Sequence, residues 1–312
     1  MNSNSNKTSY LFLSPFLVIF FIFLFVPVLY SFWISLHEVS PYTDLFNIFG
    51  DMKFVGLKHY QALIHDQQFI WSLVLTIIYA LLYIPGMIVV SLSLALLLNK
   101  DFFAKVFFRS AFFLPNVLDM LVVGFIWQLI YSPKFGLLTS FLEKVFNIHY
   151  FHETGFLENP WVALPAIAFA MVLKGSGFGM ILFMASLNNI SPSLYEAASI
   201  DGANKKQTFI NITAPHLKPT ILFLVVTGIM ATLNGFTEVY AMTNASGGPY
   251  FADTTGIFNG ETLGATKISG FYLWQKFSAG QYGYAAAMSY LLLLFALFIS
   301  YFNVKFLSGE SK

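Results

Sequence analysis

Long apolar segments alternate with short polar connectors along the whole of this 312-residue chain. Because an irregular backbone cannot satisfy its hydrogen bonds in hydrocarbon, each crossing of a bilayer needs a helix of roughly 20 apolar residues. Six segments meet that length: residues 10–37, 69–98, 110–131, 161–187, 219–243 and 283–304. The pattern therefore predicts an all-α integral membrane protein with six transmembrane helices, forming one transmembrane domain over residues 1–312.

The longest polar run between two apolar segments covers residues 191–220 and has the pattern of two short helices joined by a hinge. Ser193 and Glu196 are spaced as a capping box, and Pro192 stands just before that helix start. Gly202 is expected to end the first helix, because glycine readily adopts the left-handed conformation found there.

The second short helix is expected over residues 204–213, where Pro215 should end it because proline lacks a backbone donor.

The distribution of lysine and arginine predicts which side of the membrane holds this hairpin. One set of connectors has nine basic residues in 59 positions: 1–9, 99–109, 188–218 and 305–312. The other set has six in 99: 38–68, 132–160 and 244–282. The denser set is expected to be cytoplasmic, which places the hairpin and both termini in the cytoplasm.

Composition narrows the class of protein further. With 57% hydrophobic residues, 37 Phe and only 10% charged residues, the chain is not an ordinary soluble domain. A net charge of +1 gives no general attraction to nucleic acid, and the lack of cysteine excludes disulfides and thiolate metal sites. His149 and His152 lie three residues apart without an evident third metal ligand. The sequence contains no Gly-Lys-Ser/Thr phosphate loop, so we expect neither ATP hydrolysis nor a cofactor in this chain.

The connectors of the outer side carry some structure of their own. Residues 54–60 lead into a short amphipathic piece, and apolar residues recur at helical spacing over residues 136–147. The latter segment is equally compatible with a helix along the outer membrane surface and with a loop packed on its own spans. Residues 244–282 have turn signals at Gly247, Gly248 and Pro249 and then the composition of an extended loop.

The hairpin contains Glu196-Ala197-Ala198, then three residues and Gly202, nine residues and Ile212, and two residues and Pro215. This motif resembles the EAA loop of permease subunits from binding-protein-dependent ABC importers. One departure is Ala214, where that family usually has Leu. The resemblance implies that residues 191–214, within a coupling loop of residues 191–218, form a cytoplasmic coupling helix that docks in a groove of an ATPase subunit. The residues that would carry this coupling are Glu196, Ala197, Ala198, Asp201, Gly202, Ile212 and Pro215.

Further matches extend over nearly the whole chain: residues 54–60, 109–115, 127, 131–133, 136–138 and 283–285. They are similar to the carbohydrate-uptake class, and closer to the maltose- and glycerol-phosphate-type first permease than to its companion. Residues 250–272 look longer than is usual there. The resemblance implies a non-catalytic subunit of the bacterial cytoplasmic (inner) membrane that moves a sugar or sugar-like solute inward. Its partners would be a second permease in a heterodimer, an ATPase dimer that binds ATP and Mg²⁺, an extracytoplasmic solute-binding protein and membrane lipid, but no nucleic acid.

Three ionisable residues lie inside the expected spans: Asp119, Lys174 and Glu238. A charge near the bilayer centre is unfavourable by roughly 2.5–3.5 kcal/mol on insertion scales, so such groups normally face a partner or a cavity. A Lys174–Asp119 ion pair between antiparallel spans is geometrically possible. It is equally compatible with a structural role and with a solute pathway.

The fifth span has Asn234 and Glu238 one helical turn apart, beside a stripe of small residues. Such a stripe usually marks close helix packing, but in the resembling family this part of the span borders the substrate cavity. We therefore expect polar, small and aromatic side chains to line the path of the solute. These are Asp119, Met120, Lys174, Gly175, Phe178, Thr232, Asn234, Gly235 and Glu238.

Pro85 and Gly86 should kink the second span, more simply as a static bend than as a hinge.

Two other classes of function are less compatible with the sequence. A stand-alone secondary transporter or channel would show an inverted repeat, and none is visible. A membrane enzyme would need carboxylates or histidines gathered at one membrane face, and none converge.

Overall fold

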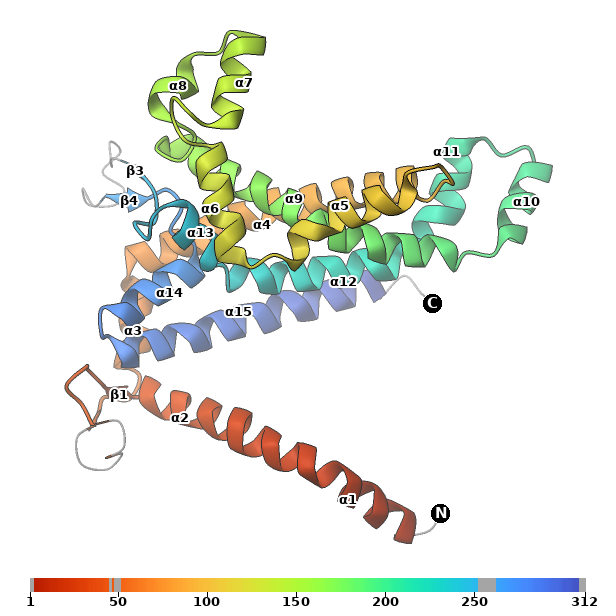
Figure 1. Cartoon of the computed structure of the whole chain (residues 1–312). Coiled ribbons are helices and arrows are strands. Elements are labelled where there is room, and N and C mark those ends of the chain that lie inside the picture. The colour runs from red at the N-terminus through yellow and green to blue at the C-terminus, as the bar shows by residue number, and fades with distance from the viewer. Residues whose placement is uncertain (1–2, 45–46, 48–51, 252–261, 309–312) are drawn as a thin grey trace. The chain divides into compact units, whose positions relative to one another are not determined.

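The computed structural model describes residues 3–44, 47, 52–251 and 262–308. It divides into two compact units, which we describe separately (Figure 1). The N-terminal unit consists of residues 1–66 and 273–294, and the core unit of residues 67–272 and 295–312. The described structure is helical apart from two small sheets of two strands each, which confirms the expectation of a mostly helical fold.

The N-terminal unit begins with a long apolar helix. α1 (Ser3–Phe20), the π-helical turn η1 (Phe21–Phe25) and α2 (Val26–Ser35) follow one another without a gap. The most apolar 18-residue window in this region contains no buried residue. A helix of this length and composition is long enough to cross a bilayer by itself.

A short sheet and a helix follow in the same unit. β1 (His37–Glu38) pairs antiparallel with β2 (Lys53–Phe54), and α3 (Lys58–His65) is the amphipathic piece expected near residues 54–60. The first half of α15 (Tyr282–Ser308) is tied to these elements. The Tyr290 hydroxyl donates to the Val28 carbonyl at 2.5 Å, and the Tyr284 hydroxyl donates to the Asp66 carboxylate.

The core unit contains the other long helices and a second small sheet. In chain order its elements are α4 (Gln67–Leu98), α5 (Lys105–Val117), α6 (Met120–Ile130), α7 (Leu137–Phe146), α8 (Tyr150–Thr154), α9 (Pro160–Asn188), α10 (Pro192–Ile200), α11 (Lys205–Thr208), the π-helical turn η2 (Phe209–Thr213), α12 (Ala214–Leu233), α13 (Thr237–Met242), β3 (Tyr250–Phe251) and β4 (Leu263–Gly264). α14 (Ser269–Ser278) and α15 each contribute residues to both units.

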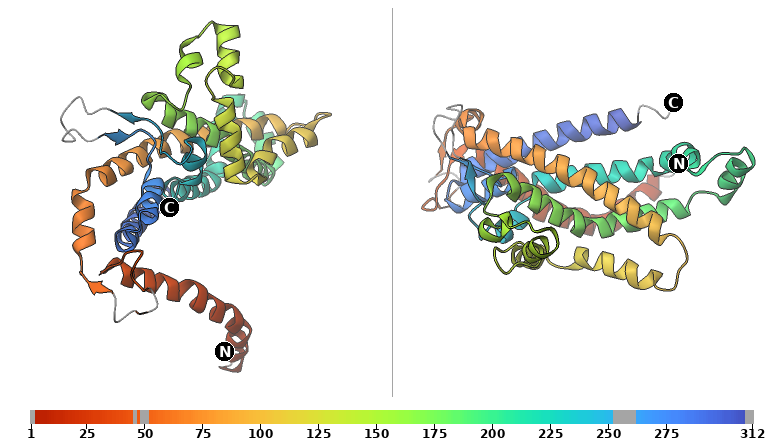
Figure 2. Two further views of the ribbon diagram at one scale, coloured as in Figure 1. Left: turned by 60° about the vertical axis from the view of Figure 1, so that its left-hand side comes forward. Right: turned by 90° about the horizontal axis from the view of Figure 1, so that it is seen from above.

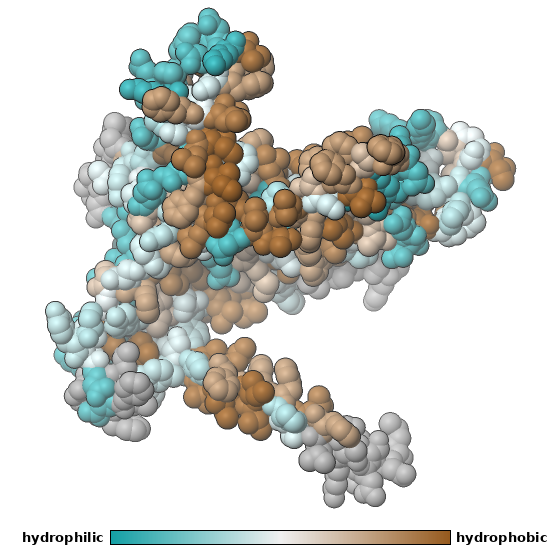
Figure 3. Space-filling model, in the orientation of Figure 1, coloured by the Kyte–Doolittle hydropathy of each residue, from teal (hydrophilic) through white to brown (hydrophobic). Residues whose placement is uncertain are grey.

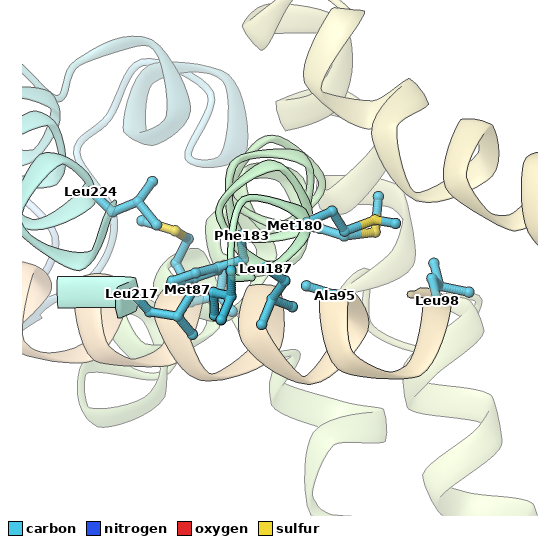
Figure 4. Close-up of a cluster of buried hydrophobic side chains, with 11 residues drawn as sticks. Met87, Ala95, Leu98, Met180, Phe183, Leu187, Leu217 and Leu224 are labelled. Carbon is cyan, nitrogen blue, oxygen red and sulfur yellow. The ribbon is translucent and has the colours of Figure 1, made fainter. Parts of the chain in front are cut away.

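α9 forms the centre of the core unit. Of its most apolar window, 61% is buried, compared with 28% for α4, as expected for a helix that is apolar on all sides. It packs along α4 and against α5 and α12 (Figure 2). Side chains from α4, α9 and α12 meet in one buried cluster, in which Figure 4 shows Met87, Phe183 and Leu217 close together. By contrast, α5 and α6 present apolar side chains on the outside (Figure 3).

Among the described residues, five helices are long and apolar enough to cross a membrane, or six if a bent pair counts as one span. The bent pair replaces the third expected span. Residues 110–131 do not form one helix, because α5 ends at Val117 and α6 begins at Met120 with a bend of 104°. Asp119 causes the interruption locally, since its carboxylate accepts the Leu121 N–H at 2.9 Å and caps a new helix.

The fifth expected span also differs from the structure at both ends. It stops at Leu233 rather than at residue 243, and Asn234 to Phe236 separate it from α13. At the other end, Pro215 does not end the preceding helix, so Lys205–Leu233 is one unbroken helical segment of 29 residues. The π-helical turn η2 explains this. In a π-helix each N–H bonds to the carbonyl five residues earlier, and here the Ala214 N–H bonds to the Phe209 carbonyl. This bond comes directly before Pro215, which has no N–H to donate, so the chain stays helical through the proline.

The connectors at the α7 end of the core unit are more regular than expected. Of the two interpretations left open for residues 136–147, the structure has the helix, α7. The described part of residues 244–282 contains the expected turn at Gly247 and Gly248, which is left-handed, and also the β3–β4 pair and α14. Residues 252–261, within the stretch 250–272 that looked unusually long, lie outside the described residues. α4 remains helical through Pro85.

Candidate functional site

A cavity of about 360 Å³ lies in the core unit among α4, α5, α6, α9, α12 and α13. Both interruptions of the apolar helices border it, because Asn116 and Met120 flank the α5–α6 break and residues 234–236 form the α12–α13 break. Non-helical backbone at membrane depth is tolerated only where it is buried in protein or lines such a cavity. The full lining is Tyr79, Tyr83, Asn116, Met120, Met171, Lys174, Gly175, Ala231, Thr232, Asn234, Gly235, Phe236, Thr237 and Glu238.

The most deeply placed charge in this central cavity is Glu238, in the first turn of α13 and only 7% exposed. The hydroxyl of Tyr79, from α4, donates to its Oε1 at 3.2 Å. Tyr79 in turn stacks on Tyr83 with ring centroids 6.0 Å apart. A buried carboxylate needs such partners, because taking it out of water unpaired is strongly unfavourable. The Tyr79 hydrogen bond therefore fixes one oxygen of Glu238.

Lys174 supplies the opposite charge from the middle of α9. Within the described part of the chain, no carboxylate oxygen lies within 4.0 Å of its ammonium group. Lys174 and Glu238 thus attract each other across the cavity without closing it as an ion pair. Such separated opposite charges leave both groups able to bind a polar ligand between them.

Two glycines leave space for polar atoms of the cavity wall because they have no side chain. A Cβ on Gly175 would lie 2.8 Å from the Tyr83 hydroxyl, and one on Gly235 would lie 2.7 Å from Oε1 of Glu238. The small residues thus accommodate polar side chains of the cavity wall. With the amide groups of Asn116 and Asn234, the cavity combines hydrogen-bond donors, acceptors and aromatic rings, a set that suits a hydroxyl-rich solute.

The α10–α11 hairpin lies at the other end of α9 from α7 and α8 (Figure 1). α10 ends at Ile200, and Gly202, two residues on, is in the left-handed conformation (φ +74°), with the Ala203 N–H donating to the Ala198 carbonyl at 2.9 Å. That hydrogen bond is the signature of a Schellman ending. α11 then starts with a complete capping box between Asn204 and Gln207.

One face of this hairpin is anchored to the core and the other is exposed. The Tyr195 hydroxyl lies 3.2 Å from Oγ1 of Thr213, and Tyr195 and Ile212 pack against the buried cluster of α4, α9 and α12. Glu196 is exposed, and so is Ile200, with 87% of its surface accessible. Glu196 and Ile200 are four residues apart in α10, so they lie on the same exposed face of that helix.

The family model of the binding-protein-dependent transport system inner membrane component matches residues 72–306, which include both the central cavity and the hairpin. The chain belongs to this family. The resemblance expected from the sequence is thereby confirmed, and this permease is a membrane component of a transport system that depends on a binding protein.

Two curated relatives cover nearly the whole permease. The arabinooligosaccharides transport system permease protein AraP of Bacillus subtilis (strain 168) is 32% identical, over 97% of this chain and 89% of the relative. The lactose transport system permease protein LacF of Rhizobium radiobacter is 31% identical, over 94% of this chain and 91% of the relative.

Solved structures share the fold. A chain of a bacterial ABC transporter involved in the import of the acidic polysaccharide alginate aligns with a TM-score of 0.77 at 22% identity, covering 99% of this chain and 98% of that one. A chain of the alginate transporter in complex with an alginate pentasaccharide-bound periplasmic protein aligns with a TM-score of 0.75 at 22% identity, covering 97% and 95%. The long bent helices of this permease are thus a known arrangement.

The structure brings together seven of the nine residues expected along the solute path of the permease. Met120, Lys174, Gly175, Thr232, Asn234, Gly235 and Glu238 line the central cavity. Asp119 and Phe178 are outside the lining. Asp119 is exposed and caps α6, and it forms no ion pair with Lys174, so that pair is absent from the structure. Phe178 is 40% exposed.

Sequence reasoning missed the aromatic wall of the cavity. Tyr79 and Tyr83 are spaced i, i+4 in the second span, one turn before Pro85, and that spacing was a usable signal. Asn116 and Phe236 had no signal, because they line the cavity only through the two helix breaks.

The coupling residues expected from the resemblance fall into two groups. Glu196, Ala197, Asp201 and Gly202 are exposed. By contrast, Ala198 is half-buried, Ile212 is partly buried against the cluster, and Pro215 lies within a continuing helix. The capping box expected at Ser193 and Glu196 is wrong. α10 starts earlier than that spacing requires, with Ser191 as its cap position and Pro192 as its first residue.

Proposed function

We propose that this permease moves a sugar or sugar-like solute into the cytoplasm through the central cavity, driven by an ATPase that docks on the α10–α11 hairpin. The observation that carries the proposal is the unbroken helix Lys205–Leu233. Its first residues belong to the hairpin, and the chain that follows its last residue, Asn234 to Glu238, lines the cavity. At 1.5 Å per residue it is a rod of roughly 40 Å.

This rod supports a direct mechanical link. A partner that closes on α10 displaces the hairpin, and the capped turn at Gly202 transmits the displacement to α11 rather than absorbing it. Because α11, η2 and α12 are continuous, the α12–α13 break then shifts against Lys174 on α9. Such a shift of a packed helix changes which side of the cavity is open, as alternating access requires.

The remaining parts of the proposal follow from charge and from the relatives. Lys205, Lys206 and Lys218 belong to the hairpin and the start of its rod, which favours a cytoplasmic hairpin and cytoplasmic termini. Relatives named for arabinooligosaccharides and lactose support a carbohydrate. The complete assembly would need a second permease, an ATPase dimer that holds ATP and Mg²⁺, and a solute-binding protein at the α7 end, whereas this chain holds no cofactor.

Co-purification and uptake test the proposal. The permease is purified from its native membranes, and co-purifying ATPase is measured for the full chain and for a variant lacking residues 193–203. We expect the ATPase to be recovered with the full chain only, while both proteins insert equally. Proteoliposomes of the complete assembly should accumulate arabinotriose, lactose or maltose only with ATP and the loaded binding protein. Recovery of the ATPase with the shortened hairpin, or uptake by this chain alone, would contradict the proposal.

A further inference from the structure

A second pocket, of about 640 Å³, lies at the α7 end of the core unit, between the end of α6, the segment before α9 and the turn after α13. We call it the outer pocket. Its volume lies within the roughly 300–1,000 Å³ of sites that hold small molecules. Its polar side chains come from three separate segments of the chain, with Gln128 from α6, Glu158 from the segment before α9, and Asn244 from the turn.

These three side chains are available to a ligand. None of them makes a hydrogen bond or ion pair with any described residue, whereas the Tyr131 hydroxyl in the same wall is already bonded to the Ala166 carbonyl at 2.9 Å. Together they present two amide groups and one carboxylate toward a single space. Amides and carboxylates in this arrangement bind adjacent hydroxyls, because each hydroxyl both donates and accepts.

The turn that carries Asn244 is held rigidly. Asn244 and Ala245 have positive φ (51° and 61°), a conformation that asparagine tolerates but that is unfavourable for alanine. Hydrogen bonds compensate for this, with the Gly247 N–H donating to Oγ1 of Thr243 at 3.1 Å and Oγ1 of Thr266 donating to the Gly247 carbonyl at 2.6 Å. These hydrogen bonds hold the backbone of the turn, so the attachment point of the Asn244 side chain in the pocket wall is fixed.

The outer pocket and the central cavity share two helices but are separated by a seal. On α6, Met120 lines the cavity and Gln128 the pocket, while on α13 Glu238 lines the cavity and Met242 the pocket. Between these levels α6 and α13 touch, because a Cβ on Gly124 would collide with the Cβ of Ala241. Along α13 the two sites are only four residues apart, or about 6 Å.

We infer that the outer pocket holds one neutral sugar unit of the transported solute before the seal between α6 and α13 opens into the central cavity. This inference rests on the proposed function. The hydroxyl-binding groups, the volume and the shared helices carry it. The negative charge of Glu158 disfavours acidic sugars, since like charges repel within one pocket, so the site selects an uncharged ring.

A single engineered cysteine tests occupancy directly, because the natural chain contains no cysteine. Gln128→Cys places a thiol in the pocket and Lys144→Cys places one on exposed α7. The complete assembly in proteoliposomes is treated with a maleimide-polyethylene glycol, and modification of this chain is read as a gel shift. A mixture of maltose, lactose and arabinotriose should slow modification of Gln128→Cys about three- to tenfold and leave Lys144→Cys unchanged. Glucuronate, and glycine at matched osmolarity, should protect neither.

Two mild variants test whether the pocket contributes to transport. Asn244→Gly keeps the left-handed turn and removes only the amide, and Glu158→Gln removes only the charge. We expect each to lower sugar transported per ATP hydrolysed about threefold to tenfold, the scale of one lost hydrogen bond. ATPase stimulation by the binding protein should stay normal. The matched control Glu153→Gln changes an exposed acid of α8 outside the pocket and should transport normally.

The outcomes separate the two proposals. If the variant lacking residues 193–203 still recovers the ATPase, or this chain alone takes up sugar, the proposed function fails. If the wild-type assembly transports none of the three sugars, the outer pocket is not a site for these neutral sugars. If it transports them while Gln128→Cys is unprotected and both pocket variants have normal coupling, the outer pocket is not a sugar site and the proposed function stands. Protection by glucuronate as strong as by the neutral sugars would overturn the selectivity for uncharged rings.

Discussion

The α10–α11 hairpin exposes a large apolar side chain, whereas the central cavity buries a charged one. Ile200 is an apolar side chain left in the open, whereas Glu238 is a carboxylate taken into the interior. Each arrangement is unfavourable by itself, since apolar surface in water and an unpaired charge in a protein interior both cost free energy. Tyr79 compensates Glu238 within the chain. No described residue buries Ile200, and under the proposed function the docked ATPase would cover it.

This difference separates a site whose buried carboxylate finds its partner within this chain from a surface that has no partner among the described residues. The polar groups of the cavity are all held by elements of the core unit of this chain, so changes there should alter movement of the solute and leave assembly intact. Under the proposed function the hairpin is one side of an interface with the ATPase, so changes there should alter assembly or coupling and leave the cavity intact. The predictions below test that separation, from the largest expected effect to the smallest.

Replacing the buried charge should have the largest effect on transport. Glu238→Ala leaves the Tyr79 hydroxyl without its acceptor and removes the negative side of the cavity, so we expect uptake by the reconstituted assembly to fall at least about tenfold. Co-purification of the ATPase should be unchanged. Glu153→Ala, on exposed α8, is the control and should behave as wild type. Loss of the ATPase together with uptake would show that the cavity also determines assembly.

The exposed isoleucine should contribute most to assembly. Burying an isoleucine in a partner groove stabilises a complex by roughly 1.5–3 kcal/mol, or about ten- to a hundredfold in affinity. Ile200→Ser should therefore weaken binding of the ATPase by about that factor, measured by the concentration of ATPase needed for half-maximal recovery. Ile200→Met, which keeps the apolar volume, should change it little. Equal loss in both variants would point to shape rather than apolar burial as the basis of docking.

The turn between the two short helices should have a moderate effect on coupling. Gly202 has φ +74°, and a Cβ added there would have no neighbouring atom within 4 Å, so substitution causes backbone strain without a collision. Gly202→Ala should cost roughly 1–2 kcal/mol and lower sugar transported per ATP about fivefold. Gly202→Asn should recover most of that loss, because asparagine tolerates the left-handed region. No difference between alanine and asparagine would show that this conformation is not needed for coupling.

The long helices of the core unit could be predicted from the sequence, and the reason is physical. α4 and α9 are apolar over 32 and 29 residues, so hydrophobicity alone places them to within a few residues. The Gly202 turn followed from local chemistry, since glycine marks a left-handed ending. The seven cavity residues followed from charges within apolar spans together with the family resemblance, which placed this part of the fifth span beside the substrate cavity.

The rest depends on hydrogen bonds that hydrophobicity does not detect. Asp119 starts a new helix inside an apolar run by capping it, so residues 110–131 looked continuous. The π-helical turn before Pro215 lets a helix continue where proline normally ends it. Tyr79 is 159 residues from Glu238, and no local pattern predicts that such distant residues meet. The features that the sequence did not predict therefore include the α5–α6 and α12–α13 breaks that border the cavity. They also include the continuous helix Lys205–Leu233 that connects the cavity to the hairpin.

An ordinary exposed ion pair gives the smallest expected effect and sets the baseline for the comparison. Lys105 lies 2.7 Å from Oδ1 of Asp101, whose side chain is 98% exposed, and holds the pKa of that carboxyl below its usual value. Because the folded pKa is the lower one, any stabilisation is present above the ordinary Asp pKa of about 4 and is lost as pH falls through the folded pKa. Solvent and salt screen the pair, so Lys105→Met should leave the melting temperature in detergent and the uptake rate unchanged between about pH 5 and 8. A change comparable with that of Glu238→Ala would mean that exposure and burial do not separate structural from functional charges in this permease.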